Sequence, residues 1–565
     1  MLNFKEIPYT RPTVEEINAT KSAQIEKLKD AENFEDFIAV YKEIEDYSYN
    51  SVFSMWNLAY IRHSLDTNDV FYKDEKDFWD NAGPEIDGLD NEITKILLES
   101  KFRPELEEAW GKLMFLNEEI GLKSFDKKII EDLKEENQLA SEYGRLMASA
   151  EVEFEGKTYT LSQLSPLMFD ANDREMRMKA YATGNDWRLK NVEQVENIFD
   201  KLVTVRANIA EKLGHENFVE TGYYRNGRNS YTKEMVENFR ESVVKYIVPI
   251  VSRLKEEQKN RIGVDVIKPF DEDYMFADGN AKPVGTPEEI FAHARVMYDE
   301  MSPSTKEAWN FMQDHDLIDV LTRPGKGGGG YQSAIQSYGA PFIFANFDGT
   351  VRDIDVLTHE VGHAWAYYVN RDIFPEKLQY APDDITEIHS MAMEFLSYPW
   401  MEAFFGASTE KYYYTHLAQK LTFLPYGVMV DEFQHHIYEN PRMTKNDRNQ
   451  LWLDLEKKYR PWLNVENVEF DEEGRRWQRQ LHIFDAPFYY IDYVLAGIVA
   501  LIFWAKSRQN YDESWEKYEK LTRMAGTKTF VDLLEDADIP TPFEGENVKL
   551  VADEVLKFLS DLKMD

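Results

Sequence analysis

Two histidines four residues apart, with a glutamate directly after the first, restrict the fold more than any other feature of this chain. They lie in DVLTHEVGHAWAYYVN, residues 355–370, as His359, Glu360 and His363. A helix turns about 100° per residue, so side chains four residues apart lie nearly above one another, and both imidazoles can reach one ion. Glu360 is displaced around the helix and can approach the open side of that ion without binding it. The pattern predicts a helix that carries a metal site.

The residue types favour zinc at this site. The chain has no cysteine, so any metal must be held by His, Asp or Glu. Two imidazoles and a carboxylate suit Zn²⁺, although cobalt and manganese also accept such ligands. Bound zinc lowers the pKa of its water toward about 7, and a neighbouring carboxylate can take the proton as the water attacks a carbonyl. We therefore expect one Zn²⁺ per chain and Glu360 as general base; the alternative is a helix whose paired histidines bind no metal.

A third ligand is expected in DDITEIHSMAMEFLSYPW, residues 383–400, because catalytic zinc keeps three protein ligands and one open position. Glu387 and Glu394 are seven residues apart, about two helical turns, and share a face. Glu387 is the predicted ligand, and Glu394 is either a supporting partner of the site or a buried structural acid. His389 is a rival ligand, but it lies two residues from Glu387 and points to another side of the helix.

Composition limits the partners. Asp and Glu total 103 against 65 Lys and Arg, which gives a formal net charge of −38. Phosphates would be repelled, so a nucleic-acid partner is disfavoured. The N-terminus lacks a basic region followed by an apolar stretch, and the longest apolar run, near 494–505, is shorter than the roughly 20 residues that span a bilayer. We expect a cytoplasmic protein without a membrane partner; the oligomeric state is not readable.

Helical patterning dominates the chain and predicts a mostly α fold. Residues 13–16 (TVEE) and 286–289 (TPEE) have the sequence of a capping box that opens a helix. Residues 33–65 combine apolar residues at helical spacing with acidic ones, as expected for one long helix or two close ones. Residues 151–161 alternate around Glu155-Gly156-Lys157 and predict a β-hairpin.

A glycine run, GKGGGG at 325–330, precedes a strand-like segment at 339–347. It lacks the Gly-Lys-Ser/Thr order of a phosphate loop, and one interpretation is a flexible connector. The other makes the segment an edge strand beside the metal helix, where an extended peptide could pair with the backbone while nearby glycines permit close approach. On this second interpretation the residues predicted to contact substrate are Gly328, Gly329, Ala340, Phe342 and Phe344.

Three segments together carry a family resemblance: LTHEVGHAWAYY, TEIHSMAMEF and HIFDAPFYYIDYVLAG. The combination resembles the oligoendopeptidase F and thimet oligopeptidase family of zinc metallopeptidases, over most of the chain. The resemblance implies an almost wholly helical fold of two lobes that enclose a deep substrate channel, with a small β-sheet next to the zinc helix. It implies zinc ligation by His359, His363 and Glu387. We expect an N-terminal helical region over 1–165 and a catalytic region over 166–565, with lobes that share segments.

The third segment offers hydrogen-bond donors for the oxyanion of a tetrahedral intermediate. The resemblance assigns this role to His482 and to the pair Tyr490 and Tyr493, with Tyr490 favoured over Tyr493 and Tyr489 least favoured. The alternative is that these tyrosines are large amphipathic core residues whose hydroxyls find local partners.

The expected function is that of a zinc endopeptidase for short unstructured oligopeptides. One alternative is a related zinc carboxypeptidase, which would need a basic pocket for a free C-terminal carboxylate. Another is a catalytically silent peptide-binding protein, which Glu360 argues against because binding a metal does not require that residue. A helical interaction protein without metal is the remaining alternative.

Overall fold

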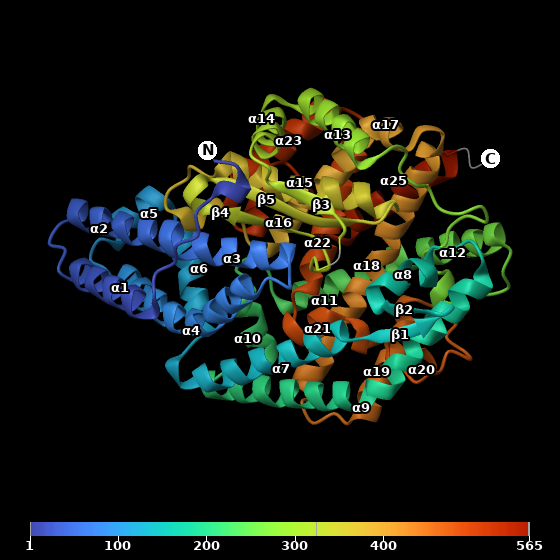
Figure 1. Cartoon of the computed structure of the whole chain (residues 1–565), viewed down its shortest axis with the longest axis horizontal. Coiled ribbons are helices and arrows are strands. Elements are labelled where there is room, and N and C mark those ends of the chain that lie inside the picture. The colour runs from blue at the N-terminus through green and yellow to red at the C-terminus, as the bar shows by residue number, and fades with distance from the viewer. Residues whose placement is uncertain (1, 324, 563–565) are drawn as a thin grey trace. The chain divides into compact units, whose positions relative to one another are not determined.

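The computed structural model describes residues 2–323 and 325–562, and most of them are helical (Figure 1). The predicted mostly α class is confirmed. The chain divides into two compact units, each built from three segments. Unit 1 comprises Met1–Leu122, Pro283–Gly406 and Lys506–Ile539, and unit 2 comprises Lys123–Lys282, Ala407–Ala505 and Pro540–Asp565. The division expected at residue 165 stays a prediction.

Unit 1 contains the predicted metal motif. Its helices are α1 (Val14–Lys29), α2 (Phe34–Asp46), α3 (Ser54–Leu65), α4 (Val70–Glu99), α5 (Arg103–Trp110), α6 (Lys112–Lys123), α13 (Pro287–Met301), α14 (Pro303–Asp314), α15 (Arg352–Asn370), α16 (Asp383–Leu396), α17 (Met401–Phe405), α23 (Tyr511–Arg523) and α24 (Phe530–Asp536). Its strands are β3 (Ile318–Leu321), β4 (Tyr331–Ile335) and β5 (Ala340–Phe347).

Unit 2 contains the segment with the predicted oxyanion donors. Its helices are α7 (Ile130–Ala148), α8 (Leu161–Phe169), α9 (Arg174–Leu213), α10 (Phe218–Arg225), α11 (Lys233–Ser242), α12 (Val248–Ile262), α18 (Thr409–Glu439), α19 (Lys445–Tyr459), α20 (Glu469–Glu472), α21 (Leu481–Asp485), α22 (Tyr490–Ser507) and α25 (Gly545–Asp561). Its strands are β1 (Glu151–Phe154) and β2 (Lys157–Thr160).

Both predicted capping boxes are present. The Thr13 hydroxyl accepts from the Glu16 amide and the Glu16 carboxylate accepts from the Thr13 amide, at the start of α1. Thr286 and Glu289 make the same reciprocal pair at the start of α13, where a proline occupies the first turn. Each pair satisfies two amides that a helix start otherwise leaves without partners.

The segment predicted as one or two helices, 33–65, is continuously helical, but its hydrogen-bond pattern changes in the middle. A π-helical turn, Tyr47–Phe53, joins α2 to α3. Such turns shift the register of the side chains that follow. In α3, the Asn57 amide donates to the carbonyl oxygen of Ala334 in β4 at 2.9 Å, which ties this helix to the sheet.

The predicted hairpin at 151–161 is confirmed. Strands β1 and β2 pair antiparallel, with Phe154 opposite Lys157. The turn residues Glu155 and Gly156 have φ of 49° and 76°. Positive φ at both central positions matches the twist of a two-residue hairpin, which explains the glycine.

The second sheet corrects one prediction. Its strand order is β3-β5-β4, with β3 parallel and β4 antiparallel to β5. The segment predicted as an edge strand is therefore the central strand, hydrogen-bonded on both sides. Ala340, Phe342 and Phe344 are fully buried, so the prediction that they contact substrate is wrong. Their near-continuous apolar sequence fits a strand covered on both faces.

Helix α15 packs against β4 and β5, as Figure 1 shows, so the expected small sheet beside the motif helix is confirmed. Strand β4 follows the glycine run directly and pairs only with β5 within its sheet. The glycine run therefore leads into an outer strand of the sheet on which α15 rests.

Helix α22 is long and apolar enough to cross a membrane by length and composition alone. The prediction from residues 494–505 counted only part of this 18-residue helix. However, 72% of it is buried inside the structure, and core helices of soluble proteins have the same composition.

Candidate functional site

Helices α15 and α16 lie in close contact, and a glycine makes this possible. A Cβ atom added at Gly362 would lie 2.5 Å from the carbonyl oxygen of His389 and 2.8 Å from the Cα of Ser390. Both are backbone atoms of α16, so no side chain can move aside to make room. Gly362, one of the two positions that the motif leaves unspecified, thus brings the two helices together, and the motif alone does not indicate this.

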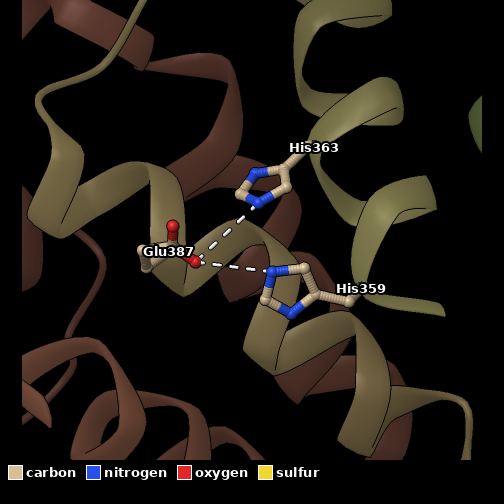
Figure 2. Close-up of side chains that lie close together, drawn as sticks. All are labelled: His359, His363 and Glu387. Carbon is tan, nitrogen blue, oxygen red and sulfur yellow. Dashed lines mark ion pairs between the residues drawn. The ribbon is translucent and has the colours of Figure 1, made fainter. Parts of the chain in front are cut away.

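The close approach brings three predicted ligands to one point. In Figure 2, His359 and His363 extend from one helix and Glu387 faces them from the other. Glu387 Oε2 lies 3.5 Å from His359 Nε2 and 3.8 Å from His363 Nε2. Ligand atoms of the three residues all lie within 4.8 Å of one another, a spacing that could hold one metal ion. The rival ligand His389 is buried and does not belong to this group.

Two side chains of α16 hold the ligands in place. Glu394, only 1% exposed, lies with Oε1 2.9 Å from His359 Nδ1. This contact leaves Nε2 free to face Glu387 and fixes the ring orientation, as carboxylates beside metal-binding histidines do. The Ser390 hydroxyl donates to Glu387 Oε2 at 3.0 Å. Ser390 is a second contributor to the site that helical spacing alone does not indicate.

Glu360 lies next to this group and is 7% exposed. Its Oε2 has no hydrogen-bond partner among the described residues. Burial, with the neighbouring charges of Glu387 and Glu394, raises the pKa of Glu360 to about 7, although the charge of His359 opposes the shift. A carboxyl with a pKa near neutrality can both take up and release a proton.

The electrostatics of the site fit a cation. Three carboxylates surround two imidazoles in a buried place, and His363 Nδ1 has no hydrogen-bond partner among the described residues. Burial lowers the pKa of His359, but its contact with Glu394 and the charges of Glu387 and Glu360 outweigh burial and raise it to about 9. The surroundings therefore favour positive charge at His359, whereas burial and the charge of His359 lower the pKa of His363.

The glycine run is anchored rather than loose. Asn346 donates to the carbonyl oxygens of Gly327 and Gly329, each at 2.9 Å. A Cβ at Gly328 or Gly329 would meet nothing within 4 Å. At Gly330 it would lie 3.1 Å from Val356 Cγ1 and 3.7 Å from Glu360 Oε1. Of the glycines in the run, Gly330 is thus the one that lies beside Glu360. In the sequence, only its position at the end of the run could have indicated this.

The predicted donors His482, Tyr489, Tyr490 and Tyr493 form one aromatic cluster in unit 2. The Tyr490 ring lies 5.1 Å from the His482 ring and 5.7 Å from the Tyr493 ring, measured between centroids. Tyr489 stacks on His482 at 6.1 Å. The Gln480 amide contacts His482 Nδ1 at 2.8 Å. The structure brings these four residues together, and they belong to a different unit from the ligand group.

Replacing Gly362 with alanine should weaken both the fold and the metal site. The added methyl would overlap backbone atoms of α16, so we expect the free energy of unfolding to fall by about 1–3 kcal/mol. Metal affinity should fall too, since Glu387 would move away from the histidines. Denaturant unfolding and metal titration of the full chain measure both effects.

The matched control for Gly362→Ala is Gly88→Ala in α4, because a Cβ there meets nothing within 4 Å. Alanine is the better helix former, so this variant should be as stable as the unchanged protein or slightly more stable. If both variants kept the original stability and metal affinity, the close approach of α15 and α16 would not depend on glycine.

Comparisons with protein families match two parts of the chain. Residues 4–125 match the Peptidase M3 N-terminal domain, and residues 305–545 match Peptidase family M3. The second match contains the whole ligand group. Among curated proteins, Oligopeptidase PepF of Bacillus subtilis (strain 168) is 22% identical over 536 residues, covering 87% of this chain and 76% of that protein.

Solved structures are similar to this chain over almost its whole length. A structure described as PZ peptidase A with inhibitor 2 is 44% identical, with a TM-score of 0.95 over 99% of both chains. An oligoendopeptidase-F from Enterococcus faecium is 14% identical, with a TM-score of 0.65 over 97% of this chain and 96% of that one, and shows the shared fold alone.

Proposed function

Since the chain belongs to peptidase family M3, a family of metallopeptidases, we propose that it is a zinc-dependent endopeptidase that hydrolyses internal peptide bonds of short, unstructured oligopeptides. The observation that carries this proposal is the convergence of His359, His363 and Glu387 within 4.8 Å, with the buried carboxyl of Glu360 beside them. No other group of three or more metal-binding side chains was found among the described residues.

The donor set fits a zinc ion, with His359, His363 and Glu387 as its ligands. Two nitrogens and one oxygen from two helices leave a position open, as catalytic zinc requires. When bound, zinc would supply a Lewis acid that acidifies water and polarises a peptide carbonyl. Glu394 would keep the His359 ring oriented through its contact at Nδ1.

Glu360 is the proposed general base. Its Oε2 would take the proton of the attacking water and pass it to the amine that leaves. The lack of a hydrogen-bond partner at Oε2 supports this role, since a carboxylate already held by donors would be a weaker base.

We also assign oxyanion stabilisation to His482 and Tyr490, with Tyr493 as a further donor. Support comes from the family resemblance and from the packing of the three rings against one another in unit 2. Preorganised donors of this kind contribute on the order of 10²–10³-fold to a rate.

Substrate contact is proposed for the glycine run rather than for β5. Gly328 and Gly329 are exposed, and β4 continues from them as an outer strand of the sheet. An extended peptide could form main-chain hydrogen bonds with such a backbone. Because these bonds do not involve side chains, the side chains of the peptide would contribute little to recognition. The proposed partners are short peptides, and we propose a cytoplasmic location, consistent with the absence of cysteine.

Cleavage of a quenched fluorescent peptide with both ends blocked tests the proposal. An endopeptidase accepts blocked ends, whereas the alternative carboxypeptidase needs a free carboxylate. We expect hydrolysis of the blocked peptide, its loss with a chelator and its recovery on addition of one Zn²⁺ per chain. Hydrolysis of only the free-ended peptide would favour the carboxypeptidase, and no hydrolysis of either with zinc bound would favour a silent peptide-binding protein.

A further inference from the structure

Unit 2 contains a cavity whose walls are cationic although the chain as a whole is strongly acidic. Its volume is about 260 Å³. Four basic and two acidic side chains line it. The basic ones are Lys255, Arg460, Arg476 and Arg479, and the acidic ones are Glu272 and Asp273. None of these residues belongs to the ligand group or to the aromatic cluster described above. We call this the cationic cavity.

Two of the basic side chains pair with carboxylates that do not line the cavity, whereas Arg460 pairs with Glu272 at the wall. Arg479 pairs with Asp471 at 3.0 Å, and Arg476 pairs with Glu456 at 3.3 Å. These pairs fix the guanidinium groups but do not use all their donors. Arg479 Nε has no hydrogen-bond partner among the described residues, nor does Arg460 Nε, whose side chain is only 4% exposed. A buried guanidinium with an unused donor is costly unless an acceptor reaches it.

The positive charge is strong enough to act on its neighbours. Burial opposes ionisation of Glu272, yet the charges of Arg460, Lys255 and Arg476 lower its pKa to about 2. Nearby, burial and then the charge of Arg479 lower the pKa of Arg188 to about 9. The basic side chains at the wall therefore favour an anionic group in this part of unit 2.

Aromatic rings form part of the wall, and one of them connects the cavity to His482. The walls include Phe169, Phe423 and Tyr426. The Tyr426 hydroxyl donates to Gln480 Oε1 at 2.8 Å, and the Gln480 amide contacts His482 Nδ1 at 2.8 Å. The cavity is thus two hydrogen bonds away from a proposed oxyanion donor.

We propose that the cationic cavity binds a carboxylate attached to an apolar body. Arginine binds planar carboxylates through paired donors, and the aromatic walls would cover the apolar part. A water occupies about 30 Å³ of liquid, so the cavity holds more than a lone small anion. The free C-terminus of a peptide and a free organic acid share this chemistry, and naming the peptide source rests on the proposed function.

Direct binding to the full chain tests this without any turnover. Calorimetry would compare N-acetyl-phenylalanine with its amide, which has the same body but no charge. We expect the acid to bind about tenfold or more tightly than the amide. Repeating the titration with a chelator separates this site from the metal site, because binding in the cavity must persist. Equal binding of acid and amide, or loss of binding with the chelator, would overturn the proposal.

Two variants change the wall charge in opposite directions. Arg476→Gln removes a cation and should weaken binding of the acid about tenfold, whereas Asp273→Asn removes an anion and should tighten it. A merely structural effect would shift both variants the same way, which would contradict the proposal. Arg253→Gln, at a side chain 56% exposed on the same unit, is the control and should bind as the unchanged protein does.

Asp273→Asn also covers the case in which Arg476→Gln does not fold, because Asp273 is partly exposed and makes no buried ion pair with the arginines. 3-Phenylpropionate, which has the carboxylate and the ring but no amide, distinguishes the sources. Binding as tight as that of N-acetyl-phenylalanine indicates a free organic acid, and much weaker binding indicates a peptide C-terminus. Acetate has no apolar body, so acetate binding as tightly as N-acetyl-phenylalanine would overturn the proposal. Failure of peptide hydrolysis would refute the proposed function while leaving these affinities unaffected.

Discussion

Replacing Glu360 with glutamine is expected to lower kcat by about 10²–10⁴-fold while the protein still binds one zinc ion per chain. The amide has the same shape but cannot take a proton. Because the three ligand atoms belong to His359, His363 and Glu387, the metal should stay in place. Folding should be little affected, since Oε2 of Glu360 has no hydrogen-bond partner to lose among the described residues. Initial rates with saturating peptide, together with metal content, measure the effect.

Glu376→Gln is a matched control for this variant. Burial, with the charges of Glu45 and Asp46, raises the pKa of Glu376 to about 7, close to that of Glu360, and both residues belong to unit 1. If a raised pKa alone mattered, both variants would be slow. We expect Glu376→Gln to keep the original kcat. Equal activity of Glu360→Gln and the unchanged protein would remove the proposed general base.

The local part of the site could be predicted because it depends on a single helix. The spacing of His359 and His363 fixes their common face wherever that helix lies in the fold. Likewise, the capping boxes and the 151–161 hairpin depend on contacts within a few residues. Glu387 lies on another helix, so helical spacing could make it only a candidate, which the family resemblance then supported. The contact that joins the two helices depends on the missing side chain of Gly362, and spacing does not reveal this.

The position of β5 could not be predicted for a related reason. Its apolar sequence identifies a strand, but whether a strand lies at an edge depends on partners elsewhere in the chain. The partner β3 is four residues long and pairs parallel to β5, with an irregularity between Asp319 and Leu321. Such a short strand has almost no pattern of its own. As a result, of the residues predicted to contact substrate, only Gly328 and Gly329 in the loop before β4 are kept in the proposal.

The cationic cavity shows the same limit at longer range. Lys255 and Arg476 are separated by more than two hundred residues, and each alone is an ordinary charged residue in a helical sequence. A basic pocket of this kind is therefore not visible in the sequence. Only the folded unit 2 brings these charges to one wall.

Removing Glu387 should produce the largest loss of metal affinity at a position outside the histidine motif. Glu387→Ala deletes one of three proposed ligands, and we expect zinc affinity to fall on the order of 10³-fold. Glu394→Gln keeps an acceptor for His359 Nδ1 but loses its charge, so affinity should fall only about 10–100-fold. Competition with a fluorescent chelator gives both values, and circular dichroism reports whether the helices are intact.

Two further variants decide whether these losses reflect ligation. Glu45→Gln replaces another buried glutamate of unit 1, 4% exposed, and should leave zinc affinity unchanged. His389→Ala removes the rival ligand and should also have little effect, because His389 is not among the residues whose ligand atoms converge. If His389→Ala lost zinc while Glu387→Ala retained it, the third ligand would be the histidine. The two helices would then have to approach in a different register, since Gly362 now contacts the backbone of His389 itself.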